Sequence, residues 1–405
     1  MPDRALAGVR VLDFGWHIAG PFASKLLADF GAEVVKVERP GGDPSRQLGP
    51  FPPDAPSPEH SATFLSLNAN KRSIVLDLKH PVGREVALRL AAHADIVVEN
   101  FRPGVMARLG LDHRQLQAVN PDIIIVSISN FGQTGPYAEY LGTDLTLWGM
   151  GELPYITGRS DRPPLKTAGA QASLHAGING AIGALAAYWQ RELVGEAQWV
   201  DVSVLEAVVN LIEFSLGLYQ CLGLVHRRRN ATVAGFHPAG RQATARGELF
   251  LMFGSRSGEQ VAVALGLPAL ADPKFATNVS RYQHREEFDA VFLPWLRRHT
   301  ASEAFRILQG EAKLPVSKVM TLRDLFEDEQ YRAREYFVDI EHPLAGLLRY
   351  AGPPFKMSET PAAYRRPAPR LGEHTREVLR ELGYAEGEIE RLIASGAAHA
   401  LTEAA

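Results

Sequence analysis

Short runs of valine, isoleucine and leucine are separated by amphipathic helical patterns in the first third of this 405-residue chain. The apolar residues of each run are largely continuous, which is typical of strands buried on both faces of a parallel sheet. The runs lie at residues 9–14, 33–38, 73–78, 95–100 and 122–129. Because parallel strands need crossover helices, the pattern predicts a doubly wound α/β domain over residues 1 to about 200.

Polar and basic residues follow several of these runs. Open α/β sheets bind ligands beyond the carboxyl ends of their strands, and the sequence places Ala19–Gly20, Asn100–Phe101 and Asn130–Phe131 there. Five basic residues are also expected along one edge of the sheet, namely Arg39, Lys71, Arg72, Arg102 and Arg108. Each alone is more simply a surface charge. As a group they could bind a ligand that carries several phosphates, because guanidinium groups pair with phosphate oxygens.

The second half of the chain predicts a smaller domain and a returning tail. Residues 200–225 have the pattern of one connecting helix that ends at Gly223. Residues 235–330 contain shorter mixed elements, with a helix predicted near 302–310. A proline-rich segment then precedes a predicted helix pair near 373–396.

Composition and charge exclude several classes of protein. The net charge of −3 provides no broad basic field for nucleic acid or an acidic membrane surface. No apolar stretch reaches the roughly 20 uninterrupted residues of a membrane span. The single cysteine, Cys221, leaves no internal disulfide and favours a cytoplasmic protein. The first residues carry charges and pass directly into a strand pattern, so we expect no signal peptide there.

The common sequence signatures of cofactor and hydrolase sites are missing. No GxGxxG motif follows a strand, and no GxxxxGK[ST] loop is present. The thirteen histidines are scattered without the spacing of metal ligands, so we expect no metal site. The GxSxG turn of α/β-hydrolases is also absent from the sequence.

Separated segments throughout the chain nevertheless share the motifs of one family. They are LAGVRVLDFGWHIAGPFASKLLADFGAEVVKVERPGGDPSR, NANKRSIVLDLK, DIVVENFRPGVMARLGL, NPDIIIVSISNFGQTGPY, VGEAQWVDVSVLEA, ALGLPALADPKFATNVSRYQHREE and RRPAPRLGEHTREVLRELGY. In this order they closely resemble the class III coenzyme A transferases, also called the CaiB/BaiF family. That family includes formyl-CoA:oxalate, carnitine and benzylsuccinate CoA-transferases.

The resemblance implies a fold and a substrate. It implies a large Rossmann-like domain at 1–206 with 335–405, a linker helix at 207–225 and a small α+β domain at 226–330. The chain would form a ring, and two rings would interlock into a dimer. Coenzyme A or acyl-CoA would be the substrate, with no metal. The implied CoA-binding positions are Ile18, Ala19, Arg39, Leu76 to Lys79, Asn100, Phe101, Arg102 and Arg108.

The catalytic position departs from the family pattern. In the family an aspartate attacks the acyl-CoA carbonyl and forms a mixed anhydride, which the CoA thiolate converts to an enzyme-bound thioester. The matching residue here is Ser173. A hydroxyl needs a neighbouring base, and its ester would be too stable to return the acyl group easily. His175, two positions further on, does not face Ser173 on a helix. We therefore interpret Ser173 as a helix N-cap.

Other acid and base positions also differ from those of related proteins. The racemases that share this fold use a histidine and an aspartate, and the matching residues are Thr143 and Ser173, so racemisation is disfavoured. Asp144 matches a position that is aspartate in many relatives and is interpreted as structural. Glu152 replaces an apolar residue of the family pattern and is the candidate for a relocated carboxylate.

Three functions remain open from the sequence. The preferred one is the aspartate-lacking subunit of a CoA-transferase, paired with an aspartate-bearing paralogue or else forming a homodimer, without nucleic acid or membrane. It would move CoA between an acyl-CoA, for example succinyl-CoA, and an acid such as an aryl-substituted dicarboxylate. The alternatives are an acyl-CoA isomerase or lyase that uses Glu152, and a non-catalytic CoA-binding protein. Trp16, His17, Trp148 and Tyr155 are candidates for lining an acyl pocket.

Overall fold

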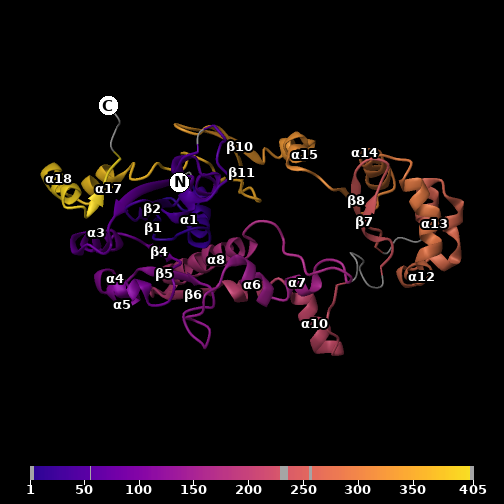
Figure 1. The fold of residues 1–405 in the computed structure, drawn as a ribbon, viewed down its shortest axis with the longest axis horizontal. Helices are drawn as coiled ribbons and strands as arrows, with labels where there is room; N and C mark the ends of the chain where they lie inside the picture. The colour runs from indigo at the N-terminus through magenta and orange to yellow at the C-terminus, as the bar shows by residue number, and fades with distance from the viewer. Residues whose placement is uncertain (1–3, 55, 229–235, 255–257, 402–405) are drawn as a thin grey trace. The chain divides into compact units, whose positions relative to one another are not determined.

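The computed structural model describes residues 4–54, 56–228, 236–254 and 258–401 (Figure 1). The chain divides into two compact units. The large unit comprises Met1–Leu153, Thr167–Glu213 and Ala333–Ala405, and the small unit comprises Pro154–Lys166 and Phe214–Arg332. The large unit is therefore assembled from three separate segments of the sequence.

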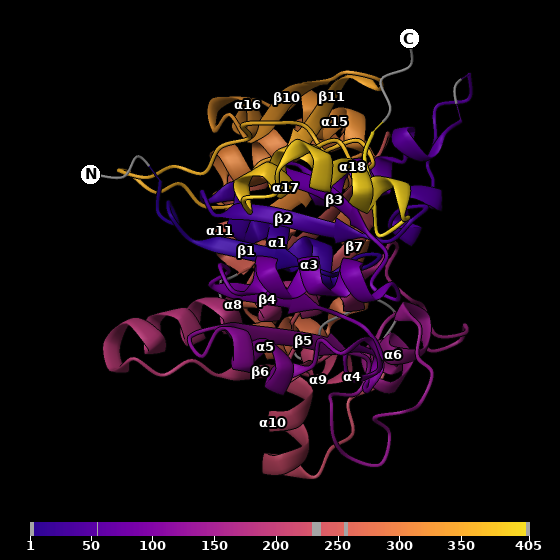
Figure 2. The same cartoon turned by 90° about the vertical axis from the view of Figure 1, so that its left-hand side faces the viewer.

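A seven-stranded sheet with the order β12-β3-β2-β1-β4-β5-β6 forms the centre of the large unit (Figure 2). The strands are β1 Arg10–Asp13, β2 Glu33–Glu38, β3 Lys71–Leu76, β4 Ile96–Glu99, β5 Ile124–Ser129, β6 Trp199–Ser203 and β12 Ala398–His399. Only β12 pairs in the antiparallel direction, and the neighbours from β3 to β6 are parallel. The predicted doubly wound α/β fold is confirmed.

Helices cover both faces of this sheet. The helices of the large unit are α1 Ala19–Asp29, α2 Ala62–Asn68, α3 Pro81–Ala91, α4 Val105–Leu109, α5 His113–Val119, α6 Asp144–Met150, α8 Gln171–Val194, α9 Val204–Val209, α17 Thr375–Glu381 and α18 Glu386–Ala394, whereas α7 Leu153–Ile156 belongs to the small unit from Pro154 on. Successive side chains of a strand point to opposite faces of the sheet. In β1, Val11 therefore packs with α1 and α8 on one face, and Leu12 packs with α3 and α17 on the other. The predicted helix pair near 373–396 is confirmed.

Glycines let α8 lie close to α1 and to the sheet. A Cβ atom on Gly177 would come within 2.8 Å of the Ala19 carbonyl oxygen, and one on Gly180 within 2.7 Å of Ile128 Cδ1. Both distances are too short for a side chain. The Gly/Ala-rich sequence of α8 therefore reflects close packing of the helix whose first turn contains Ser173.

The small unit has its own sheet and its own core. Its elements are β7 Ala239–Ala243, β8 Glu248–Met252, β9 Val316–Lys318, α10 Glu213–Leu222, α11 Gly258–Leu265, α12 Asn278–Gln283, α13 Arg285–Leu296, α14 Ala301–Phe305 and α15 Leu322–Glu327. The strands form an antiparallel sheet of order β7-β8-β9. A π-helical turn, Arg306–Glu311, continues α14, so the helix predicted near 302–310 is confirmed.

A short helix and a hairpin return the chain to the large unit. They are α16 Glu329–Ala333, β10 Phe337–His342 and β11 Gly346–Ala351. Within the described ranges, no helix is long and apolar enough to cross a membrane. The same residues contain no cluster of three or more His, Cys, Asp or Glu side chains that could hold a metal ion.

The single helix predicted over 200–225 is wrong. Residues Trp199–Ser203 form β6 and pair with β5, and two separate helices, α9 and α10, follow. Ser203 ends the strand and caps α9 by accepting a hydrogen bond from the Glu206 amide. The alternation of apolar and polar residues in Trp199–Ser203 is the sequence signal of this strand.

Candidate functional site

The loops that follow β3, β2, β1 and β4 lie side by side, because these strands are neighbours in the sheet. We call this row of loops the carboxyl edge. Four of the implied CoA-binding residues lie on this edge and expose a positive charge, namely Lys79 after β3, Arg39 after β2, Arg102 after β4 and Arg108 in α4. Leu76, the last residue of β3, is fully buried. It therefore offers a ligand only its backbone.

The loop between β1 and α1 is fastened to the end of β4. The Trp16 amide donates to Asn100 Oδ1 at 2.7 Å, and Asn100 Nδ2 donates to the Trp16 carbonyl at 2.9 Å. A Cβ atom on Gly20 would lie 2.8 Å from Asn100 Oδ1, so this approach requires glycine. Helix α1 then begins at Ala19, and its N-cap residue Ile18 has no capping side chain. The first amides of α1 thus form a favourable position for an anion.

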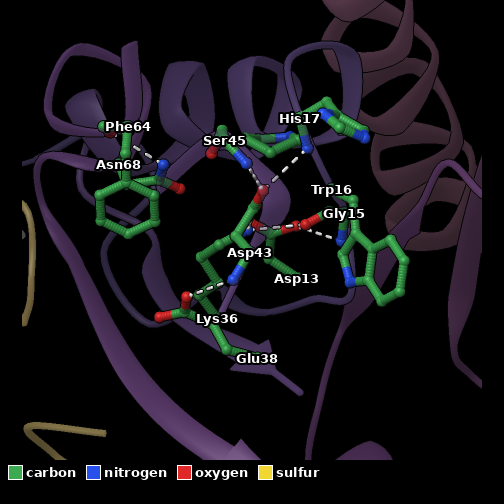
Figure 3. Close-up of polar contacts among 12 residues, drawn as sticks. Asp13, Gly15, Trp16, His17, Lys36, Glu38, Asp43, Ser45, Phe64 and Asn68 are labelled. Atoms are coloured by element: carbon green, nitrogen blue, oxygen red, sulfur yellow. Dashed lines mark hydrogen bonds and ion pairs between the residues drawn. The ribbon is translucent and has the colours of Figure 1, made fainter. Parts of the chain in front are cut away.

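Buried charges below this loop hold its backbone in place (Figure 3). Lys36, fully buried in β2, donates to the Gly15 carbonyl at 2.7 Å and pairs with Asp43 at 2.8 Å. Asp43 Oδ1 in turn accepts from the His17 and Ser45 amides at 3.0 and 2.7 Å. Burial alone lowers the pKa of Lys36, but the charges of Asp13 and Asp43 outweigh it and leave that pKa raised.

Two of the five basic residues predicted at one edge lie elsewhere. Lys71 begins β3 and is fully buried, and its ammonium donates to Pro21, Asn68 and Asp13 at 2.7, 2.8 and 2.9 Å. Burial lowers the pKa of Lys71 to about 8, although the Asp13 charge acts in the opposite direction. Arg72, also at the amino end of β3, pairs with two glutamates of α17. The predicted grouping is therefore wrong for both, because they start a strand instead of following one.

The remaining members of the carboxyl edge are held by aromatic and backbone contacts. The Arg39 guanidinium lies 4.7 Å from the centre of the Trp16 ring, and the Phe101 ring meets Trp16 edge-on at 5.0 Å. Arg102 donates to the Glu139 carbonyl at 2.9 Å. Asn130 lies outside this edge, after β5, and donates to the Gly142 carbonyl at 3.1 Å. These contacts orient the exposed cations without neutralising them.

Ser173 is the third residue of α8, and the N-cap of that helix is Ala170. The interpretation of Ser173 as the N-cap is therefore wrong. Its amide and its hydroxyl both donate to Asp144 Oδ2, at 3.0 and 3.2 Å. Asp144 begins α6, which is itself capped by Thr143. A carboxylate from α6 thus satisfies the amino end of α8, which supports the structural interpretation of Asp144.

This contact determines what Ser173 can do. Its hydroxyl hydrogen is directed at a carboxylate oxygen, and the other oxygen of Asp144 is buried from solvent. Glu152 follows α6 at the end opposite to Asp144, roughly 10 Å along a seven-residue helix. Its backbone φ of 67° is unusual for a residue other than glycine. The carboxylate beside Ser173 is therefore Asp144, and a catalytic role for Glu152 stays a prediction.

The aromatic residues proposed for an acyl pocket have different surroundings. Trp148 is buried in the core of the large unit. Trp16 is occupied by its contacts with Phe101 and Arg39. Tyr155 belongs to the small unit, whereas His17 and both tryptophans belong to the large one. Trp16 and Trp148 therefore have packing roles, which weakens the case for a pocket shaped to an aromatic ring.

Sequence reasoning missed Glu99, a buried carboxyl group directly before Asn100. Glu99 lines a cavity of about 160 Å³ together with Ser127, Gln133 and Trp199. Burial raises the pKa of Glu99 to about 7, although hydrogen bonds from Ser127 and the Phe101 amide lower it. The only sequence signal was an acidic residue at the end of an otherwise apolar strand.

Glu99→Gln is expected to become relatively more stable as pH rises. Between the ordinary pKa of 4.5 and about 7, the unfolded chain has lost the Glu99 proton while the folded chain retains it, so the wild type loses stability with rising pH. Urea unfolding at pH 4.5 and pH 8 should show the variant gaining about 3 kcal/mol over the wild type. The exposed Glu329→Gln is the control, and a pH-independent difference for Glu99→Gln would contradict the prediction.

Comparison with known proteins identifies related sequences and structures. The family model described as CoA-transferase family III matches residues 6–375. The chain is 35% identical to succinyl-CoA–D-citramalate CoA-transferase of Chloroflexus aurantiacus, over 96% of this chain and 97% of that protein. It is 34% identical to the alpha subunit of succinyl-CoA–L-malate CoA-transferase from Chloroflexus aurantiacus, over 96% and 91% of the two chains. A CaiB/BaiF family protein from Brucella suis matches with a TM-score of 0.83 and 30% identity, over 94% of this chain and 99% of that one.

Proposed function

This chain belongs to CoA-transferase family III, as its motifs indicated, and on that premise we propose that it serves the transfer of CoA between succinyl-CoA and a second dicarboxylic acid. The names of two relatives support this choice, since one acts on D-citramalate and the other on L-malate, with succinyl-CoA as the donor. We propose an aliphatic acceptor of this kind in place of the aryl-substituted acid, because Trp16 and Trp148 are engaged in packing.

Coenzyme A is proposed to bind along the carboxyl edge of the large unit. Exposed Lys79, Arg39, Arg102 and Arg108 supply positive charge there for its phosphates. The amino end of α1, at Ala19, supplies backbone amides close by. Asn100 and Phe101 fix the neighbouring loop. The buried charges around Lys36 would then keep the site preformed in the absence of CoA.

We further propose that this chain is the subunit without the nucleophile, and that a paralogue supplies the aspartate. The observation that carries the proposal is the serine at the family's aspartate position: Asp144 Oδ2 could accept its hydroxyl proton, but the ester formed would not readily return the acyl group. A carboxylate is ionised at neutral pH and forms an anhydride that remains reactive, whereas a serine ester holds its acyl group. A relative named as an alpha subunit makes a two-subunit arrangement reasonable. The two chains would interlock, as the resemblance implies, and the single cysteine favours the cytoplasm as their location.

Co-expression with an aspartate-bearing paralogue tests this proposal. The chain alone should show no exchange of thioesters, and the co-purified pair should transfer CoA. Ser173→Ala in this chain should leave most of the activity of the pair intact, because it removes no nucleophile and only one hydrogen bond to Asp144, worth about 1.5–3 kcal/mol of stability. An aspartate-to-alanine change in the paralogue should abolish it. Transfer by the isolated chain through an adduct on Ser173 would overturn the proposal.

A further inference from the structure

A second cavity lies at the end of the large sheet opposite to the carboxyl edge. Its volume is about 680 Å³. The amino halves of β1 and β2 form one side, and the last turn of α3 and helix α17 flank it. The segment at Arg365–Arg366 closes its rim. We call it the amino-end cavity, and all its lining residues belong to the large unit.

Arginine dominates the lining of the amino-end cavity. The charged residues that line it are Arg4, Arg10, Arg72, Arg365, Arg366, Glu33, Glu377 and Glu381. Arg72 takes both Glu377 and Glu381 as ion-pair partners, at 2.9 and 2.7 Å. The other four arginines form no ion pair within the described part of the chain, and a single lining carboxylate, Glu33, remains to balance them.

Backbone contacts fix two of these arginines, Arg365 and Arg366, beside each other. Asn70 Oδ1 accepts hydrogen bonds from the amides of Arg365 and Arg366 at 2.6 and 3.3 Å, which fastens the rim to the start of β3. Arg365 also donates to the Ala28 carbonyl at 2.6 Å. Burial lowers the pKa of Arg365, and the charges of Arg4 and Arg366 lower it further, although the Asp29 charge acts in the opposite direction. The cluster therefore keeps its like charges together at an energetic cost that a bound anion would relieve.

Part of the lining of the amino-end cavity, which we call its floor, is apolar. Leu12 and Val35 from the strands, Leu90 from α3 and Leu382 after α17 line it. A ligand that fits this arrangement has an anionic end for the arginines and an apolar or aromatic body for the floor. The volume lies within the range of roughly 300–1,000 Å³ typical of small-molecule sites.

We propose that the amino-end cavity binds a nucleoside diphosphate. Two adjacent phosphates carry enough oxygen atoms and negative charge for the four arginines, because a guanidinium can donate two parallel hydrogen bonds to phosphate oxygens. The base and ribose lie over the apolar floor. The site is separate from the carboxyl edge, so it can be filled while CoA is bound and can serve as a regulatory site.

Titration calorimetry of the full chain with ADP tests the proposal. The wild type should bind ADP, and Arg365→Ala/Arg366→Ala should weaken binding at least about tenfold, because two charged hydrogen-bond donors are lost. Arg10→Ala, an exposed change at the start of β1, should weaken it as well. Arg376→Ala removes an arginine of α17 that pairs with Glu386 and Glu390 outside the cavity, and should have no effect.

Because ADP is also part of CoA, its binding site must be distinguished from the carboxyl edge. Arg39→Ala should leave ADP affinity unchanged while it weakens CoA binding. Pyrophosphate should bind more weakly than ADP, since it lacks the part that covers the floor. ADP binding that depends on Arg39 and tolerates Arg365→Ala/Arg366→Ala would overturn the proposal. So would a wild type that fails to bind ADP, or a double variant whose only change is in oligomeric state.

Discussion

Lys36→Met is expected to lower the free energy of unfolding by about 3–5 kcal/mol, the range found when one partner of a buried ion pair is removed. Methionine retains the length of the side chain but leaves the Asp43 carboxylate buried without its cation. It also removes the donor to the Gly15 carbonyl, which fixes the β1–α1 loop. Urea unfolding followed by circular dichroism measures the loss, and CoA titration should show weaker binding by the folded fraction.

The pH dependence of the same variant provides an independent check. The Lys36 charge holds the pKa of Asp43 below its ordinary value despite burial, which by itself raises it. A carboxyl group with a lowered pKa contributes stability above its unfolded pKa and loses it as pH falls through its folded pKa. The wild type should therefore lose stability below about pH 4, and Lys36→Met should lose less over that interval.

A surface lysine serves as the matched control for Lys36→Met. Lys356 is exposed and pairs with Glu335 at 3.5 Å. Exposed ion pairs contribute about 0–1 kcal/mol, so Lys356→Met should change stability little. Equal stability losses for the two variants would show that the buried cluster around Lys36 does not hold the loop in place.

Ser173→Asp is expected to give the isolated chain CoA-transferase activity at least about 10³-fold above that of the wild-type chain, because it restores the carboxylate nucleophile. The new side chain lies in the first turn of α8, where the helix dipole favours a negative charge. Succinyl-CoA with a dicarboxylic acceptor is the assay, and trapping of the enzyme thioester with hydroxylamine identifies the adduct.

Asp144 sets a condition on that gain of activity. Its Oδ2 atom lies 3.2 Å from Ser173 Oγ, so the introduced carboxylate must turn away from it or share a proton with it. The activity of Ser173→Asp should therefore rise with pH as the new carboxyl group ionises. Ser173→Asn introduces a side chain of nearly the same size as aspartate but without a carboxylate nucleophile, and this variant should remain inactive. If Ser173→Asp binds CoA and is still inactive, the chain has lost more than its nucleophile.

Much of the large unit could be predicted from local patterns. Five runs of apolar residues indicated five of the parallel strands, because burial on both faces leaves a continuous hydrophobic sequence. The order of these runs also located Arg39 and Asn100 beyond the carboxyl ends of β2 and β4. The strand at Trp199–Ser203 was not predicted. Apolar and polar residues alternate along this edge strand, and its sequence continues without a break into the helix that follows.

Some features of the site could likewise be predicted from the sequence, whereas others depend on the tertiary structure. By itself, the sequence determined the family, the parallel sheet and the serine at position 173, since each of these depends on residue identity and spacing along the chain. Tertiary structure alone decided that Lys71 is buried, that Arg72 faces α17, and that Asp144 receives the hydroxyl of Ser173. In the contact of Arg72 with α17 and in that of Ser173 with Asp144, the two partners lie 29 or more residues apart in the sequence. No local pattern specifies which distant group folding brings within hydrogen-bonding distance.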